Sequence, residues 1–151
     1  MSLIANVVGV DDDITNSCIA QLQGSGFDVL RSQSITQDLA ALVFNPGLYA
    51  ASAAESDPAL PARQLQMLAD SHRQQLLFAG GGSIVVIGTR DWLGAGPRVE
   101  LAAAAGALVS TVRSLALLMA PAGVTVNAVL PNFQAAVPDE ASGGEPRILT
   151  Q

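Results

Sequence analysis

Short apolar runs alternate with longer stretches of helical periodicity along this chain. The apolar runs are brief and carry little polar alternation, which is typical of strands that are buried on both faces of a parallel sheet. They predict five strands, at residues 3–10, 27–30, 41–44, 84–87 and 124–130.

Three segments between these runs have the spacing of helices. Apolar residues recur every three or four positions in 14–24, 62–78 and 98–120. Residues 35–40 have room for one or two helical turns, and the proline-bearing stretch 49–61 is predicted to be a loop. Strands that alternate with helices predict an α/β fold with a doubly wound parallel sheet.

Composition narrows the class of protein further. The chain has 151 residues, of which 50% are hydrophobic and 13% are charged, so we expect one domain with part of its surface covered by another subunit. A net charge of −6 with only 7 basic residues argues against binding to nucleic acid. The N-terminus has no basic leader, and we predict no membrane span, so a cytoplasmic location is expected.

The segment from Gly82 to Phe133 resembles the second half of the short-chain dehydrogenase/reductase family. The resemblance rests on GSIV at 82–85, RSLA at 113–116 and VNAV at 126–129. Counting back from Arg113 places the family's catalytic tyrosine on Leu101 and its lysine on Ala105. Neither side chain can hold the proton that the family's hydride chemistry requires. The resemblance therefore implies that catalysis is lost.

The family's substrate-polarising serine falls at Gly88 or Thr89. Thr89 is a possible remnant of that residue, because its hydroxyl could polarise a carbonyl. The alternative is a structural role at the end of a strand. Trp92 follows in the next loop, near the place where the resemblance puts the substrate.

The first strand and helix also resemble this family, from Gly9 to Val29. Two glycine positions of the family's phosphate-binding loop hold Asp13 and Thr15, and Asp11 and Asp12 lie beside them. Carboxylates cap a helix N-terminus well but repel a phosphate. We expect no cofactor on this chain, and a metal site is disfavoured because capping explains the carboxylates.

The resemblance also implies which parts of the scaffold are missing. Only a short connection fits between Arg31 and Leu39, where the family has a helix, a strand and a second helix. We therefore predict a reduced Rossmann-like sheet of about five strands in the order 2-1-3-4-5. The domain is placed at 1–133, followed by an irregular tail at 134–151, with 148–150 a possible remnant strand.

Two predicted helices correspond to those that form a four-helix bundle between subunits in the family. The helix over 98–120 is apolar nearly all round, so it needs cover on both sides. The residues predicted to lie in the subunit interface are Leu65, Leu68, His72, Leu76, Leu101, Ala104, Leu108, Val112 and Leu115.

These expectations favour a non-catalytic subunit. It would pair through the bundle with an active short-chain dehydrogenase, which would carry the NAD. Two alternatives remain open: a cofactor-free ligand-binding or regulatory homo-oligomer, and a nucleotide-independent enzyme that uses the cleft around Thr89 and Trp92.

Overall fold

A five-stranded parallel sheet runs through the molecule. The computed structural model describes residues 3–33, 35–48, 57–78, 80–94 and 98–131. The strands are β1 (Leu3–Gly9), β2 (Phe27–Leu30), β3 (Ala41–Asn45), β4 (Ser83–Ile87) and β5 (Thr125–Val129). Their order is β2-β1-β3-β4-β5, and every neighbouring pair is parallel. The predicted α/β class and strand order are confirmed.

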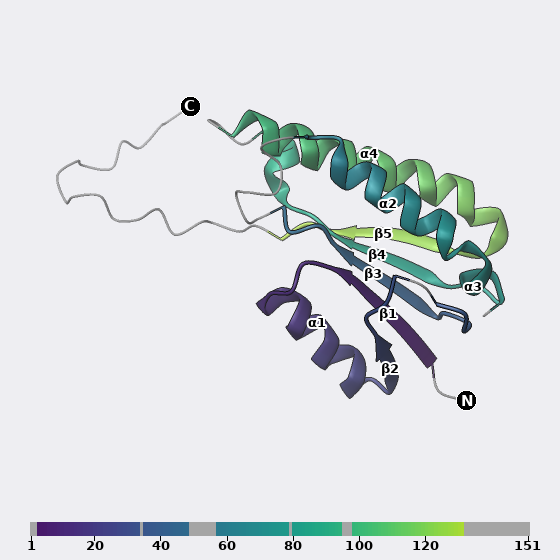
Figure 1. Ribbon diagram of the computed structural model, residues 1–151. Coiled ribbons are helices and arrows are strands. Elements are labelled where there is room, and N and C mark those ends of the chain that lie inside the picture. The colour runs from purple at the N-terminus through teal and green to yellow at the C-terminus, as the bar shows by residue number, and fades with distance from the viewer. Residues whose placement is uncertain (1–2, 34, 49–56, 79, 95–97, 132–151) are drawn as a thin grey trace, which may run out of the picture.

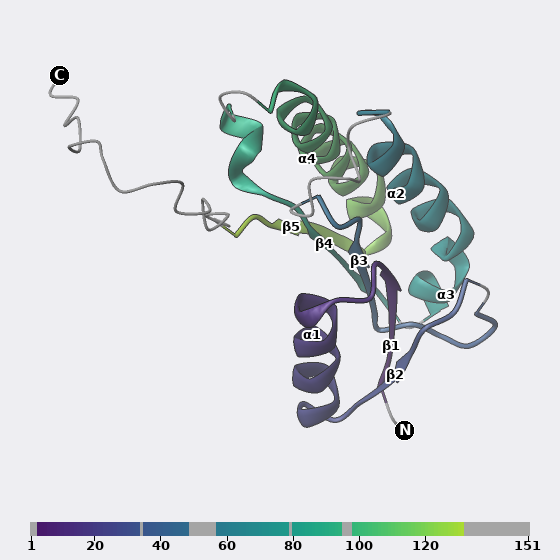
Figure 2. The same cartoon turned by 60° about the vertical axis from the view of Figure 1, so that its left-hand side comes forward.

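The helices are divided unequally between the two faces of the sheet. On one face lie α2 (Leu60–Ser71), α3 (Arg73–Phe78) and α4 (Val99–Met119), whereas α1 (Asp13–Gly24) is the one described helix on the other (Figures 1 and 2). Two short 3-10 helices, η1 (Arg90–Leu93) and η2 (Ala120–Ala122), flank α4. Among the described residues, α1 lies mainly against β1 and β2 and covers less of β4 and β5 on its own side.

The main hydrophobic core lies between the sheet and the α2/α4 layer. Strand residues such as Leu42, Ile84 and Val126 pack there against Leu65 of α2 and Leu108 of α4. A smaller cluster on the opposite face joins Val7, Val43 and Ile87 to the apolar side of α1. This cluster is smaller because, in the described part of the chain, a single helix covers this face of the sheet.

The predicted helix over 62–78 is interrupted at His72, which separates α2 from α3. The backbone of His72 leaves the helical region, with φ −104° and ψ 5°. Its ring is buried, with Nε2 3.3 Å from Nδ2 of Asn6 in β1 and Nδ1 3.0 Å from the Leu68 carbonyl oxygen. The prediction of one continuous helix is wrong at this residue, although the His72 N–H still donates to the Leu68 carbonyl and the His72 carbonyl accepts from the Leu76 N–H, both over 3.1 Å.

Residues 35–40 form no helical turn, so that prediction is also wrong. The segment is an extended strap held by α3: Gln75 Nε2 donates to the Ile35 carbonyl over 3.0 Å, and the Leu39 N–H donates to the Gln75 carbonyl over 3.1 Å. Ile35 and Leu39 are both buried, so tertiary contacts decide the conformation of the strap.

Residues 99–122 are long and apolar enough to span a membrane, with a mean hydropathy of 1.7. Glu100 and Arg113 interrupt this stretch, and the absence of a membrane span stays a prediction. In the fold, one side of α4 packs on the sheet and contributes to the main core. A core helix of a globular domain meets the same criterion. The predicted tail at 134–151, and most of the predicted loop at 49–61, lie outside the described residues.

Candidate functional site

The candidate site lies at the carboxyl ends of β1 and β3. In the strand order, β1 has β2 on one side and β3 on the other, and Gly9 is in register with Asn45. Open parallel sheets bind ligands where the direction of winding reverses in this way. The loop from Gly9 into α1 is therefore the place to test for a cofactor.

Gly9 lets the two strand ends approach closely. Its φ of +128° is unfavourable for residues with a side chain, and an added Cβ would lie 1.9 Å from the Asn45 carbonyl oxygen. The next N–H, that of Val10, donates to that same oxygen over 3.0 Å. The start of the loop is therefore held against the end of β3.

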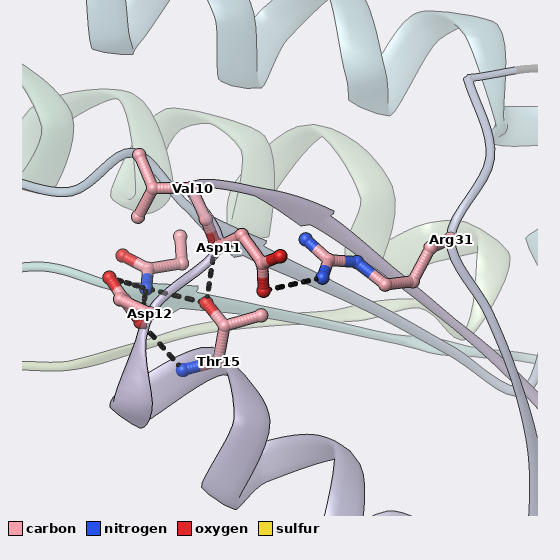
Figure 3. A network of polar contacts seen from close by, with 6 residues as sticks. Val10, Asp11, Asp12, Thr15 and Arg31 are labelled. Atoms are coloured by element: carbon pink, nitrogen blue, oxygen red, sulfur yellow. Dashed lines mark hydrogen bonds and ion pairs between the residues drawn. The ribbon is translucent and has the colours of Figure 1, made fainter.

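The N-terminus of α1 is capped by the protein's own carboxylate. Asp12 Oδ1 accepts a 2.8 Å hydrogen bond from the Thr15 N–H (Figure 3). The Thr15 hydroxyl donates to the Val10 carbonyl over 2.8 Å and accepts from Asn45 Nδ2 over 2.9 Å. Asn45 Nδ2 also lies 3.3 and 3.4 Å from the two Asp12 carboxylate oxygens. The buried Thr15 and Asn45 side chains thereby join the loop to β3.

The three aspartates diverge rather than form one cluster. Asp11 pairs with Arg31 at 2.9 Å and Asp12 turns inward as the cap (Figure 3). Asp13 is exposed. Among the described residues, no group of three His, Cys, Asp or Glu side chains is placed to hold a metal ion. Cys18, one turn further along α1, has its pKa raised by burial and, to a lesser extent, by the Asp12 charge.

This loop does not fit the pyrophosphate of a dinucleotide. A phosphate at a helix N-terminus needs free N–H groups and space for its oxygens. Here the Thr15 N–H is already bonded to Asp12, and the buried Thr15 side chain stands where the resemblance expects a glycine. A bound phosphate would also meet the Asp12 charge at close range.

The two positions expected for catalytic residues face the core. Leu101 is 5% exposed and Ala105 is 1% exposed, and both lie on the side of α4 that packs on the sheet. Neither side chain carries a titratable group. These positions contribute packing and no acid–base chemistry.

The hydroxyl of Thr89 is bound within its own loop. It donates to Asp91 Oδ2 over 2.8 Å and accepts a weaker contact from the Asp91 N–H at 3.4 Å, at the start of η1. Asp91 also accepts from Arg98 over 3.2 Å. The guanidinium of Arg113 lies 5.8 Å from the centre of the Trp92 ring. These contacts are those of a structural strand end.

Two of the cavities formed by the described residues lie on opposite sides of the sheet. One, of about 770 Å³, lies between α2 and the carboxyl ends of β1 and β3. The other, of about 600 Å³, is an apolar trough between α1 and the neighbouring strands, lined by residues such as Val85, Ile87 and Val129. Neither Thr89 nor Trp92 lines either cavity.

The structure places most residues of the predicted subunit interface inside the chain. Eight of the nine are buried in the single chain, and Leu68 is half-buried. A side chain that its own sheet already covers cannot be the contact surface for a partner. The prediction is wrong for those eight residues: Leu65, His72, Leu76, Leu101, Ala104, Leu108, Val112 and Leu115.

A buried polar group was missed by the sequence analysis. Asn6, in the middle of β1, donates to the Ser32 carbonyl over 2.8 Å and accepts from the Ser32 N–H over 3.1 Å, besides its contact with His72. Asn6 therefore joins Ser32, just after β2, to His72 at the α2–α3 junction. A polar residue inside the apolar run 3–10 was the available signal.

Solved structures with a similar fold include short-chain dehydrogenase/reductases. Acetoin dehydrogenase from Enterobacter cloacae matches with a TM-score of 0.67 and 20% identity, over 87% of this chain and 75% of its own. An oxidoreductase of the short-chain dehydrogenase/reductase family from Burkholderia thailandensis matches with a TM-score of 0.59 and 14% identity, over 88% and 69%. NAD⁺-bound xylitol dehydrogenase matches with a TM-score of 0.58 and 12% identity, over 86% of this chain and 70% of its own.

At these identities the comparison establishes the fold alone. The chain has the Rossmann-like fold of the short-chain dehydrogenase/reductases. No protein-family model and no curated protein matches the sequence.

Proposed function

We propose that this chain is a shortened member of the short-chain dehydrogenase/reductase family that acts as a non-catalytic subunit. It would pair with an active, NAD-dependent member of that family and stabilise it in a cytoplasmic hetero-oligomer. The observation that carries the proposal is the Asp12 cap on α1, which occupies the phosphate site with the protein's own carboxylate. The apolar residues at both expected catalytic positions support it.

The proposed contact surface is the outward stripe of α4. It comprises Ala103, Ala107, Ser110, Ser114 and Leu117, which recur at alternating spacings of four and three residues and so lie on one side of the helix. Small side chains let a second helix approach closely, and Leu117, which is 80% exposed, provides an apolar anchor. This surface replaces the inward residues predicted from the sequence.

The arrangement resembles that of (hydroxy(phenyl)methyl)succinyl-CoA dehydrogenase of anaerobic toluene degradation. That enzyme combines two family members, of which only one is active. We propose a partner of this kind. A partner that binds only the folded chain also stabilises it by mass action.

The test is co-expression with a short-chain dehydrogenase encoded beside this chain. We expect a mixed oligomer by native mass spectrometry that binds one NAD per two chains. Leu117→Asp should prevent assembly, whereas Leu93→Asp, at a residue of comparable exposure in η1, should not. A stable homo-oligomer that ignores the dehydrogenase would contradict the proposal, as would assembly that survives Leu117→Asp.

A further inference from the structure

The cavity of about 770 Å³ beside the capped loop has its own chemistry. Its volume falls within the range of about 300–1,000 Å³ that is usual for small-molecule sites. It lies at the reversal point of the sheet, where α/β folds bind their ligands. Its walls come from the ends of β1 and β3 on one side and from α2 on the other.

The lining is uncharged throughout the described residues. Phe44, Pro46 and Leu60 supply apolar surface, and Gln33, Gln64 and Ser71 supply neutral hydrogen-bonding groups. Arg31 and Arg63, which lie close in sequence to the lining residues Gln33 and Gln64, are already paired with Asp11 and Asp57. An anionic ligand would therefore enter without a counter-charge and close to the Asp12 carboxylate, which is costly.

Apolar surface at the mouth of the cavity is left open to water. Met67 lines the cavity from α2 and is 71% exposed, and Leu60 beside it is also exposed. A methionine thioether packs favourably against the edges of aromatic rings. A ligand that covered both side chains would gain the free energy of burying them.

From this lining we infer that the cavity binds an uncharged, mainly apolar aromatic small molecule, with Gln33 and Gln64 hydrogen-bonding its polar groups. The ligand would occupy the strand-end crevice without using the phosphate site that Asp12 closes. This inference does not depend on the proposed partner.

A matched pair of fluorophores tests both the place and the charge. N-phenyl-naphthylamine is uncharged, and anilinonaphthalene sulfonate has the same ring system with a sulfonate. The titrations use chains that carry Val129→Asp, which blocks the apolar trough on the other face of the sheet. Ser17→Asp blocks the same trough from α1 if Val129→Asp does not fold.

We expect saturable binding of the neutral probe, and binding of the sulfonate at least about tenfold weaker. Adding Met67→Asp should lower the affinity for the neutral probe by about tenfold or more, whereas adding Leu93→Asp should leave that affinity unchanged. Circular dichroism checks that each variant is folded. The inference is overturned if the neutral probe does not bind saturably, if both probes bind equally, or if Met67→Asp has no effect.

Discussion

Asn45 fastens the loop that opens α1, because its side-chain amide lies 2.9 Å from the Thr15 hydroxyl and 3.3 Å from the Asp12 carboxylate. Its own Oδ1 accepts the Gly47 N–H over 3.0 Å. One buried amide therefore joins the end of β3 to the start of a helix that follows a different strand. The polar groups of the loop that opens α1 therefore bond one another rather than a ligand.

Removing the cap should destabilise the domain. We expect Asp12→Ala to lower the free energy of unfolding by about 2 kcal/mol, because the Thr15 N–H loses its acceptor and Asn45 loses part of its hydrogen bonding. Asp13→Ala, at the exposed neighbour, should change it by no more than about 0.5 kcal/mol. Urea denaturation of both variants measures the difference, and equal losses would contradict the role given to Asp12.

Adding one methyl group at Gly9 should disrupt the site. An alanine Cβ would overlap the Asn45 carbonyl oxygen and would demand an unfavourable φ, so we expect a loss of about 3 kcal/mol or more. Gly24→Ala is the matched control, since nothing lies within 4 Å of its Cβ position and it lies in a helix. That variant should be neutral or stabilised by up to about 1 kcal/mol. Thermal unfolding distinguishes the two, and a fully stable Gly9→Ala chain would refute the close approach.

Restoring the family's lysine should harm the fold rather than restore activity. Ala105→Lys places a charge where the side chain is 1% exposed, with an expected loss of about 3–5 kcal/mol. Ala103→Lys, two residues away on the exposed side of α4, should cost no more than about 0.5 kcal/mol. Denaturation curves and an NAD-reduction assay on both variants give the answer. Dehydrogenase activity in Ala105→Lys would contradict the prediction that the lysine alone does not restore activity.

The Cys18 thiol should make stability depend on alkaline pH. Burial first, and then the Asp12 charge, raise the pKa of this thiol in the folded chain above its ordinary value of 9.0. The unfolded chain therefore releases the proton at lower pH, so the contribution of Cys18 to stability is present below pH 9.0 and is lost as the pH rises through the folded pKa.

Alkylation with iodoacetamide measures this directly. Near pH 9.0 the folded chain should react more slowly than the denatured chain, because less of its thiol is ionised. Replacing Cys18 with serine should remove the corresponding slope from stability measured against pH. Equal rates in the folded and denatured chains would show that the environment of the thiol has been misjudged.

Local patterns were enough to predict the sheet. The five apolar runs became β1 to β5, because short continuous apolar runs are typical of strands in a parallel sheet. The order of the strands, which was expected from the resemblance to the family, is also confirmed. The helix of 98–120 was equally clear, and it ends within a residue of its prediction. The capping role expected for carboxylates before α1 is met by Asp12.

The errors came from contacts between distant residues. Local sequence patterns do not predict that the His72 ring contacts Asn6, 66 positions away. They also do not predict that Gln75 hydrogen-bonds the strap at Ile35. The side of α4 that meets the sheet was also misjudged, because a helix that is apolar nearly all round gives periodicity little to distinguish. The burial of Leu101 and Ala105 in the folded chain shows that both lie on the side of α4 that faces the sheet.

The unequal cover of the sheet has a practical consequence for preparing this protein. The trough beside α1 is lined by apolar side chains of β4 and β5, of which Val129 is 54% exposed, and collisions between such surfaces grow more frequent with concentration. The yield of soluble protein should therefore depend more on a slow rate of synthesis than on a large amount of messenger RNA. Low temperature, a weak promoter and a mild non-ionic detergent should each keep more of it in solution.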